Sequence, residues 1–391
     1  MKIVQINAVY ESGSTGRTVK ELHMSSAKYG IESYVFCANM DEPSQRIYCM
    51  GNTMTRAIHG IMSRITGLQG CFSYIATKKA IRKLKSIQPD IVHLRNLHSN
   101  YVNLPMLLRF LASYNTPTII TLHDCWFYTG HCCHYLGDNC DKWKSECSQC
   151  PSIHQWNESW FFDTSKQMFN MKKQLFEHIS NLTVIGVSDW ILGEAKASFL
   201  KSSSKFSRVY NWVDVDRFSM KKEKKDTGII LSVASRWTKE KGLNDIISVA
   251  AVRTEYTFRL IGEIPDGVKL PSNIVSAGSI SDLDQLCQEY QSAEVFLYLS
   301  HQETFGKVVV ESMACGTPVI VYNVTAIPEL VGPKCGVVVD YLNWKQAAGA
   351  IDIAKKMNPL DCRIWVENNF AKENLIQRQI DIYREAINSR M

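Results

Sequence analysis

The chain has 391 residues, of which 45% are hydrophobic and 21% charged, and it carries a net charge of +6. It is too long for one ordinary hydrophobic core, and its composition is typical of a globular protein with two domains rather than a disordered or fibrous one. No window offers the ~18 uninterrupted apolar residues of a membrane span, and the first residues lack the apolar run of a signal peptide, so we expect a cytoplasmic protein.

Short β-branched runs alternate with helical patterns along the chain, which predicts parallel sheets covered by helices on both faces. In the first half, strands are expected at residues 2–7, 33–37, 91–94, 118–122 and 183–187. In the second half, they are expected at 228–233, 256–261, 273–277, 295–299 and 318–321. The predicted fold class is therefore α/β, with two doubly wound Rossmann-like domains.

The domain boundaries follow from breaks in these patterns. An N-terminal domain is expected over residues 1–207, with a cysteine-rich insertion at 125–151. Residues 208–227 lack either period and end in a charged run, so they are expected to form the interdomain linker. A C-terminal domain is expected over 228–370, followed by an amphipathic helix over 371–391.

Basic residues are concentrated in the first half of the chain. Residues 1–210 contain 23 Lys and Arg against 15 Asp and Glu, whereas residues 211–391 contain 21 against 23. The densest basic segment, residues 56–89, has seven basic residues and no acidic one. Two interpretations stay open: a solvated helix face, or contact with an anionic phospholipid or a polyanionic acceptor.

Two glutamates stand eight positions apart in SHQETFGKVVVESMACG, where a predicted strand runs into a helix. Ligands of doubly wound sheets bind at the carboxyl ends of strands, so Glu303 is expected at the ligand-facing mouth. The amide groups near Phe305 and Gly306, at the positive end of the helix, favour a phosphate. Glu311 lies farther along the helix, and a carboxylate pair suits the hydroxyl groups of a sugar or ribose. The alternative is two solvated acids at a helix end.

Charged and small residues follow three other predicted strands. Arg236 and Lys241 follow the first strand of the second half, and two cations at such a place suit a pyrophosphate. His123 follows the fourth strand of the first half, while Gly13 and Gly16 follow the first strand and permit close approach of a ligand to the backbone. Each feature alone also occurs on ordinary surfaces, but their shared position predicts one cleft between the two domains.

These residues make the chain resemble the retaining glycosyltransferases of family 4, which have the GT-B fold of two Rossmann-like domains facing each other across a cleft. The resemblance covers essentially the whole chain, and its motifs here read ETFGKVVVESMACGTPVI, SRWTKEKG and TLHD. It implies that Glu303 contacts the donor sugar and Glu311 the ribose of the nucleotide. It also implies that Arg236 and Lys241 hold the diphosphate and that His123 lies by the transferred sugar.

The resemblance has further implications for the site and for catalysis. The segment from Gly13 to Gly16 would approach the diphosphate or the acceptor, and the helix over 371–391 would pack back on the N-terminal domain. The departing phosphate can itself take the acceptor proton, so catalysis would need no metal ion or other cofactor. The protein would mainly stabilise negative charge on the diphosphate, through its two cations and the helix end at Gly306.

The implied function is transfer of a hexose from a nucleotide-diphosphate sugar donor to a saccharide or lipid-linked saccharide acceptor, in the synthesis of cell-surface polysaccharide. An anionic membrane surface is one expected partner, which would place the protein at the inner face of the plasma membrane; no nucleic acid is expected. Two alternatives are a GT-B sugar-nucleotide epimerase, which would change the donor without an acceptor, and a zinc-bearing nucleic-acid-binding protein, which would shift nucleic acid in a gel.

The segment HDCWFYTGHCCHYLGDNCDKWKSECSQCP, residues 123–151, holds six of the thirteen cysteines. Cys147 and Cys150 have the spacing in which two thiolates reach one tetrahedral metal. A four-ligand zinc site would be completed by Cys140 and by Cys132 or Cys133, with His131 or His134 as substitutes. Such a zinc ion would be structural, because four protein ligands leave no open position. The alternative is a set of reduced thiols or a redox pair.

Overall fold

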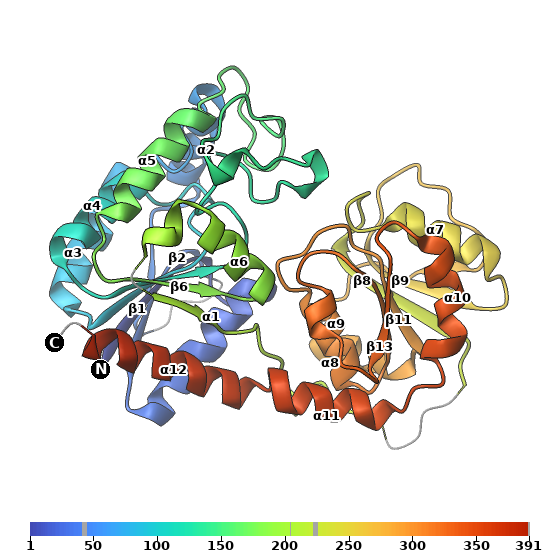
Figure 1. Cartoon of the computed structure of the whole chain (residues 1–391). Helices are drawn as coiled ribbons and strands as arrows, with labels where there is room; N and C mark the ends of the chain where they lie inside the picture. The colour runs from blue at the N-terminus through green and yellow to red at the C-terminus, as the bar shows by residue number, and fades with distance from the viewer. Residues whose placement is uncertain (41–44, 204, 222–225, 390–391) are drawn as a thin grey trace. The chain divides into compact units, whose positions relative to one another are not determined.

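The computed structural model describes residues 1–40, 45–203, 205–221 and 226–389, and it contains two compact units (Figure 1). The first unit comprises Met1–Val209 together with the chain from Ile376 onward, and the second comprises Tyr210–Leu375. Residues 222–225 of the expected linker and 390–391 of the expected terminal helix lie outside the described residues.

The first unit is built on a sheet of seven parallel strands in the order β3-β2-β1-β4-β5-β6-β7. The strands are β1 (Lys2–Val9), β2 (Glu32–Asn39), β3 (Ile47–Cys49), β4 (Ile91–Leu94), β5 (Thr118–Leu122), β6 (Leu182–Gly186) and β7 (Lys205–Arg208). Its helices are α1 (Gly13–Ser26), α2 (Thr53–Thr66), α3 (Tyr74–Ile87), α4 (Leu104–Tyr114), α5 (Ser165–Glu177), α6 (Asp189–Ala197) and most of α12 (Lys372–Asn388).

The second unit is built on a sheet of six parallel strands in the order β10-β9-β8-β11-β12-β13. The strands are β8 (Ile229–Arg236), β9 (Thr257–Glu263), β10 (Ile274–Ser276), β11 (Val295–Tyr298), β12 (Val319–Tyr322) and β13 (Gly336–Val339). Its helices are α7 (Leu243–Val252), α8 (Leu283–Ser292), α9 (Lys307–Ala314), α10 (Trp344–Ala354) and α11 (Pro359–Phe370).

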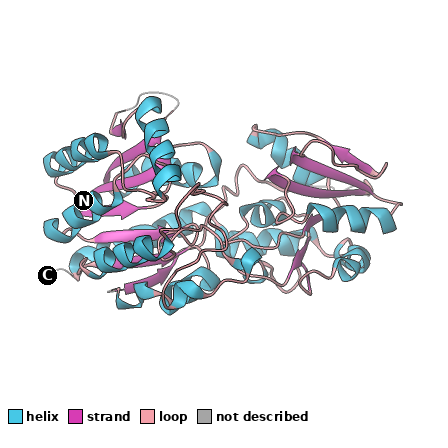
Figure 2. Ribbon diagram, turned by 90° about the horizontal axis from the view of Figure 1, so that it is seen from above, coloured by secondary structure: helices cyan, strands magenta, loops and turns pink. Residues whose placement is uncertain are grey.

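Helices lie on both faces of each sheet (Figure 2). The central strands β4, β5, β6, β11 and β12 are buried at every residue, which explains why they read as unbroken apolar runs. The prediction of two doubly wound parallel α/β domains is confirmed. The arrangement of the two sheets across a cleft stays a prediction.

The strand order reverses once in each sheet, between β1 and β4 in the first unit and between β8 and β11 in the second. At such a point the loops leaving the two neighbouring strands run to opposite faces of the sheet and open a crevice at their carboxyl ends. The crevice is where ligands bind in doubly wound sheets. A ligand site is therefore expected in the loops that follow β1, β4, β8 and β11, and in the loop after β5, which lies beside β4.

Candidate functional site

In the second unit, the loops that follow β8 and β11 are joined by main-chain contacts. The amide N–H of His301 donates to the carbonyl oxygen of Glu240 at 2.8 Å, and the Ser300 hydroxyl donates to the same oxygen at 3.2 Å. Gly242 has a φ of +76°, and a Cβ atom there would lie 2.0 Å from the carbonyl oxygen of Leu299. Only glycine fits at position 242, so the two loops are held rigidly against each other. We call residues 236–242 and 299–306, which contain these two loops, the rim of the second unit.

Lys241 and Glu303, both predicted as site residues, form an ion pair across this rim. Their side chains are 34% and 16% exposed, respectively. The Tyr298 hydroxyl donates to the same Glu303 carboxylate, and the Glu303 N–H donates to the Thr325 hydroxyl at 3.1 Å. Burial and the neighbouring carboxylate hold the pKa of Tyr298 well above its usual value, so this hydroxyl remains a donor. Glu303 is thus fixed in one orientation at the mouth of the sheet.

Arg236 is the last residue of β8, and its side chain is 64% exposed. Its Nε atom lies 3.8 Å from a carboxylate oxygen of Glu263, at the end of the neighbouring strand β9. A long guanidinium held by one exposed, weak ion pair turns readily toward an incoming anion. Arg236 and Lys241 therefore stand on the same rim, one exposed and one half-buried.

Helix α9 begins at Lys307, directly after Gly306, whose φ is +93°. The first amide groups of a helix have no partner within it, and they carry its positive end. Phe305 is buried, and its ring packs on Tyr210 and Phe370 at centroid distances of 5.8 and 6.0 Å. Its side chain therefore anchors the loop, and its main chain is the part that a ligand can meet.

Glu311 lies inside the second unit, with 1% of its surface exposed. Its carboxylate accepts a hydrogen bond from the hydroxyl of Tyr290, on α8, at 3.2 Å. A buried carboxylate with such a donor keeps a fixed position. Its contact with a ribose stays a prediction.

A histidine and aspartate pair that sequence reasoning missed supports the same rim. The Nε2 atom of His301 lies 2.8 Å from a carboxylate oxygen of Asp245, in the first turn of α7. The rings of Tyr322 and Tyr341 lie 6.1 and 5.7 Å from the imidazole. The pair connects the loop after β11 to α7, and His301 is two residues before Glu303 in that loop. The available signal was the position of His301 directly after a predicted strand.

In the first unit, the two glycines predicted as site residues, Gly13 and Gly16, are required by the structure for different reasons. Gly13 has a φ of +65°, and a Cβ atom there would have open space around it. At Gly16 a Cβ atom would lie 3.0 Å from the amide nitrogen of Glu11 and 3.1 Å from a Val9 methyl group. Gly16 thus lets α1 begin tightly against the end of β1. Approach of a ligand to this segment stays a prediction.

His123 follows β5 and lies 3.2 Å, through Nε2, from an Nη atom of Arg95. Burial and the Arg95 charge lower the pKa of His123 to about 3, so the imidazole is neutral near pH 7. Because a guanidinium can only donate, Nε2 accepts, and the proton sits on Nδ1. Arg95 is itself buried after β4, and burial lowers its pKa to about 10. Sequence reasoning missed Arg95 because a lone arginine at a strand end has no motif.

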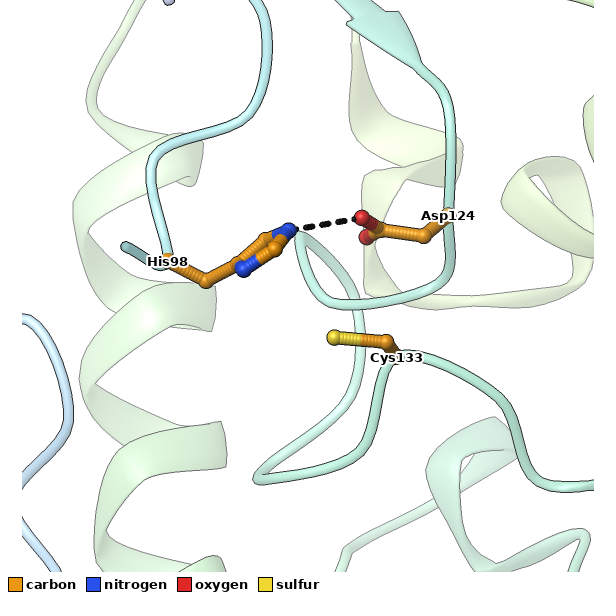
Figure 3. Close-up of side chains that lie close together, drawn as sticks. All are labelled: His98, Asp124 and Cys133. Atoms are coloured by element: carbon orange, nitrogen blue, oxygen red, sulfur yellow. Dashed lines mark hydrogen bonds and ion pairs between the residues drawn. The ribbon is translucent and has the colours of Figure 1, made fainter. Parts of the chain in front are cut away.

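Three potential metal ligands meet beside His123: His98, Asp124 and Cys133 (Figure 3). His98 Nε2 lies 2.9 Å from an Asp124 carboxylate oxygen, and the three ligand atoms lie within 4.8 Å of one another. Burial alone would raise the pKa of Asp124, but the His98 charge and hydrogen bond lower it to about 2. The carboxylate is therefore ionised. Among the described residues, these three are the group whose ligand atoms all lie within 4.8 Å of one another. The sulfurs of Cys132, Cys140, Cys147 and Cys150 do not form such a group.

The adjacent cysteines of the insertion lie in different surroundings. Cys133 lies with His98 and Asp124, and Asn157 donates to its sulfur at 3.8 Å. Cys132 lies among the other insertion thiols: burial, together with the neighbouring Cys150, Cys147 and Cys140, raises its pKa to about 12. All thirteen cysteines of the chain are free thiols.

The two histidines considered as substitutes are engaged elsewhere. His131 is buried with Nδ1 2.6 Å from the Gln69 side-chain nitrogen, and burial lowers its pKa to about 4. The His134 ring packs on Trp156 at 5.1 Å. Cysteine sulfurs are thus the better candidates for ligands in this insertion.

A buried lysine, also missed from sequence, lies among these thiols. The ammonium group of Lys172 donates to the carbonyl oxygens of Trp126 and Thr129 at 2.6 and 3.0 Å, and lies 3.7 Å from the centroid of the Trp126 ring. Burial lowers its pKa to about 7, and the nearby thiols oppose this shift. Lys172 supplies positive charge where thiolates would need it.

Two family models together match almost the whole chain. Residues 15–217 match "Glycosyltransferase Family 4", and residues 214–371 match "Glycosyl transferases group 1". An uncharacterised 41.2 kDa protein in the cps region of Klebsiella pneumoniae is 23% identical over 380 residues, covering 90% of this chain and 92% of that protein. A putative colanic acid biosynthesis glycosyl transferase of Escherichia coli K12, WcaC, is 20% identical over 63% of each chain.

Solved structures show the same architecture. Sucrose-phosphate synthase from Thermosynechococcus elongatus superposes with a TM-score of 0.71 at 17% identity, over 100% of both chains. HepE from Anabaena, in complex with UDP, superposes with a TM-score of 0.64 at 15% identity, over 98% of this chain and 100% of that one. At these identities the likeness establishes the fold.

Proposed function

This chain belongs to Glycosyltransferase Family 4, and we propose that it transfers a hexose from a nucleotide-diphosphate sugar to a saccharide with retention of configuration. It is a glycosyltransferase with GT-B architecture. The observation that carries the finer proposal is the ion pair between Lys241 and Glu303, held on a rigid rim beside the start of α9. A cation, a carboxylate and the positive end of a helix together suit a diphosphate joined to a sugar.

In the proposed reaction, the bond between sugar C1 and the leaving phosphate oxygen breaks, and the acceptor oxygen bonds to C1 on the same face. The acceptor proton passes to an oxygen of the departing diphosphate. The negative charge that grows on the diphosphate is stabilised by Lys241, by Arg236 and by the amides at the start of α9. These groups take the part that a metal ion plays in metal-dependent transferases, so the proposed catalysis is metal-independent.

Two further residues have proposed contacts with the donor sugar. Glu303 accepts hydrogen bonds from its hydroxyl groups, because its carboxylate is ordered at the mouth of the sheet. His123, with Nε2 turned to Arg95, is proposed to lie by the transferred sugar. Neither role requires a proton to leave the protein.

The acceptor is proposed to be a saccharide or lipid-linked saccharide in the synthesis of cell-surface polysaccharide. The names of relatives support this: the colanic acid transferase, and an O-antigen chain mannosyltransferase of Escherichia coli that is 47% identical over 51 residues. The Anabaena neighbour was solved with UDP and with UDP-glucose, which supports a nucleotide-sugar donor.

Thermal melting against UDP, GDP, ADP and their sugars tests the donor site. A ligand at ~100 times its dissociation constant adds ~2.7 kcal/mol to the folded state, so one nucleotide family should raise the Tm clearly. Product analysis with that donor should show sugar transfer only when an acceptor is added. Conversion of the donor without an acceptor would identify an epimerase, and no stabilisation by any nucleotide would contradict the proposal.

We also propose a structural zinc ion on Cys132, Cys140, Cys147 and Cys150. Two observations support it: the Gly130 N–H donates to the Cys147 sulfur at 3.2 Å, as amides do to thiolate ligands, and the Lys172 ammonium interacts with Cys147 and Cys132. The four sulfurs do not all lie within 4.8 Å of one another, so the ion would have to draw them together. Cys133 lies apart, with Asp124 and His98. The ion would hold the insertion that follows His123.

Metal analysis of protein purified without chelator should find about one zinc per chain. Cys147→Ser with Cys150→Ser should lose it, while Cys133→Ser, the matched control, should keep it. Loss of metal in Cys133→Ser alone would assign the ion to the group with His98 and Asp124 instead. A fully active, metal-free protein would contradict both.

A further inference from the structure

Helix α2 turns its apolar side chains away from the protein. The exposed apolar side chains lie at the spacing of one helical face and are 37% to 68% exposed: Met54, Ile58, Ile61 and Met62. The buried positions of the same helix are polar or small: His59, Gly60 and Ser63. A surface helix of a globular protein has the opposite arrangement, so α2 has an unpartnered apolar face.

Specific contacts fix α2 in this orientation. The Nδ1 atom of His59 lies 2.7 Å from the Ser73 hydroxyl, and its ring packs edge-on against Phe72 at 5.5 Å. A Cβ atom at Gly60 would lie 3.2 Å from the Asn100 amide, so the helix approaches the unit closely there. Rolling α2 to bury its isoleucines would break these contacts. The contacts of His59 and Gly60 therefore hold α2 with its apolar face toward solvent.

An aromatic loop continues this face at the C-terminal end of α2. Trp160, Phe161 and Phe162 are 46% to 70% exposed. The Trp160 N–H donates to the Arg64 carbonyl oxygen at 2.7 Å, and the Arg64 side chain pairs with Glu158 at 3.1 Å. These contacts place the three aromatic rings beside the helix.

The first turn of α3 adds two more exposed apolar side chains, Tyr74 and Ile75. The Ser73 hydroxyl, directly before them, is the partner of His59 on α2, so the two helices meet here. Exposed basic side chains follow along α3: Lys78, Lys79, Arg82 and Lys85. Between residues 56 and 89 the chain has no acidic residue to oppose them. We call the apolar residues of α2, the aromatic loop and the first turn of α3 the docking surface.

We propose that the docking surface binds in the plane of an anionic phospholipid bilayer. Aliphatic side chains on one helix face, exposed Trp and Tyr, and neighbouring Lys and Arg are the features of interfacial membrane helices. In the described part of the chain no helix is long and apolar enough to cross a bilayer, so the contact is interfacial. This inference deepens the proposed function by assigning the surface that meets the membrane, and it rests on that function only for a lipid-linked acceptor.

Flotation with vesicles tests the surface directly. Wild-type protein should bind phosphatidylglycerol-containing vesicles at low salt, bind phosphatidylcholine vesicles weakly, and lose binding as salt rises. Ile58→Ser with Ile61→Ser should lower the partition coefficient on the order of tenfold. Phe161→Ser with Phe162→Ser should lower it similarly.

The second unit offers a matched control. Ile353 and Ile364 are 58% and 45% exposed, close to the 52% and 47% of Ile58 and Ile61. Ile353→Ser with Ile364→Ser should therefore leave vesicle binding unchanged, and all variants should keep the wild-type Tm and nucleotide stabilisation. Equal loss in the control pair, or no binding to anionic vesicles at low salt, would overturn the inference. The inference would also be overturned if the protein did not bind vesicles but formed a dimer that the Ile58→Ser and Ile61→Ser changes abolish. Because the measurement is binding, it can fail while transferase activity stands.

Discussion

One ammonium group, that of Lys241, joins the two loops of the second unit through Glu303. In the proposed complex it lies between that carboxylate and the diphosphate, so it is oriented before the donor arrives. Arg236 differs, because its exposed guanidinium lies 3.8 Å from the Glu263 carboxylate and must turn toward the ligand. The two cations should therefore both stabilise the transition state.

Removing either cation is expected to slow turnover with little effect on folding. Lys241→Ala and Arg236→Ala should each lower kcat/KM by at least tenfold and up to about a hundredfold, since one fixed charge contributes ~3 kcal/mol to the transition state. Lys239→Ala is the matched control, since this exposed lysine lies in the same loop. Steady-state kinetics and melting curves make the comparison. Near-full activity of both variants would remove the diphosphate assignment.

Residues in motifs could be chosen as candidates from the sequence, whereas Arg95, His301 and Asp245, which belong to no motif, were missed. Lys241 and Glu303 could be identified because their spacing and neighbours follow a known pattern, and the structure brings them together. Arg95, His301 and Asp245 have no such spacing, and their roles arise from contacts between segments distant in sequence. The sequence left Cys132 and Cys133 equivalent, because orientation within a loop without regular structure has no periodic signal.

At the scale of elements, the close approach of α7 to β11 fixes the candidate site. The loop before α7 passes so near Leu299 that its Gly242 has no room for a side chain. Strand β11 and the loop before α7 therefore cannot separate without disturbing both Lys241 and Glu303. The two loops meet because the strand order of the second sheet places β8 beside β11.

Gly242→Ala is expected to lower the Tm by about 5–10 °C, because a Cβ atom meets a carbonyl oxygen and the backbone is left-handed. It should also lower activity, since Lys241 is the preceding residue. Gly267→Ala separates the two causes: its φ is +80°, but nothing lies within 4 Å of the added atom. We expect it to lower the Tm by about 2–4 °C only. Equal shifts in the two variants would show that steric contact is unimportant.

The central strands were predicted, whereas three of the four edge strands, β3, β7 and β13, were missed; the fourth, β10, was predicted over 273–277. β4, β5 and β11 are buried on both faces and read as apolar runs. β3 has three residues, and β7 reads Lys-Phe-Ser-Arg, so neither has such a run; both lie at sheet edges, as does the missed β13. Edge strands depend on their single neighbour more than on their own residues.

For the whole molecule, buried neutral histidines should make stability sensitive to mild acid. Burial lowers the pKa of His59 and His131 to about 4 and holds that of His93 well below its usual value, and burial with Arg95 lowers that of His123 to about 3. All four lie in the first unit. Below the ordinary histidine pKa of about 6.5, the unfolded chain binds protons that the folded unit does not, so stability falls as pH falls.

Urea unfolding between pH 6.5 and 4.5 should show this loss, with a slope of up to about 1.4 kcal/mol per pH unit for each histidine. His59→Asn keeps a polar side chain near Ser73 but cannot be protonated, so it should flatten the slope. The free energy of unfolding should be compared at matched ionic strength. A slope unchanged by His59→Asn would exclude that residue as a source.

The division of the chain between the two units sets an order for its synthesis. The chain leaves the first unit after Val209 and returns to it at Ile376, and within that unit the Tyr383 hydroxyl lies 2.6 Å from Nδ1 of the buried His93. A ribosome therefore releases every residue of the second unit before it releases the helix that completes the first. Nascent N-terminal domains usually fold first, but here the first unit cannot complete its packing until α12 has been synthesised.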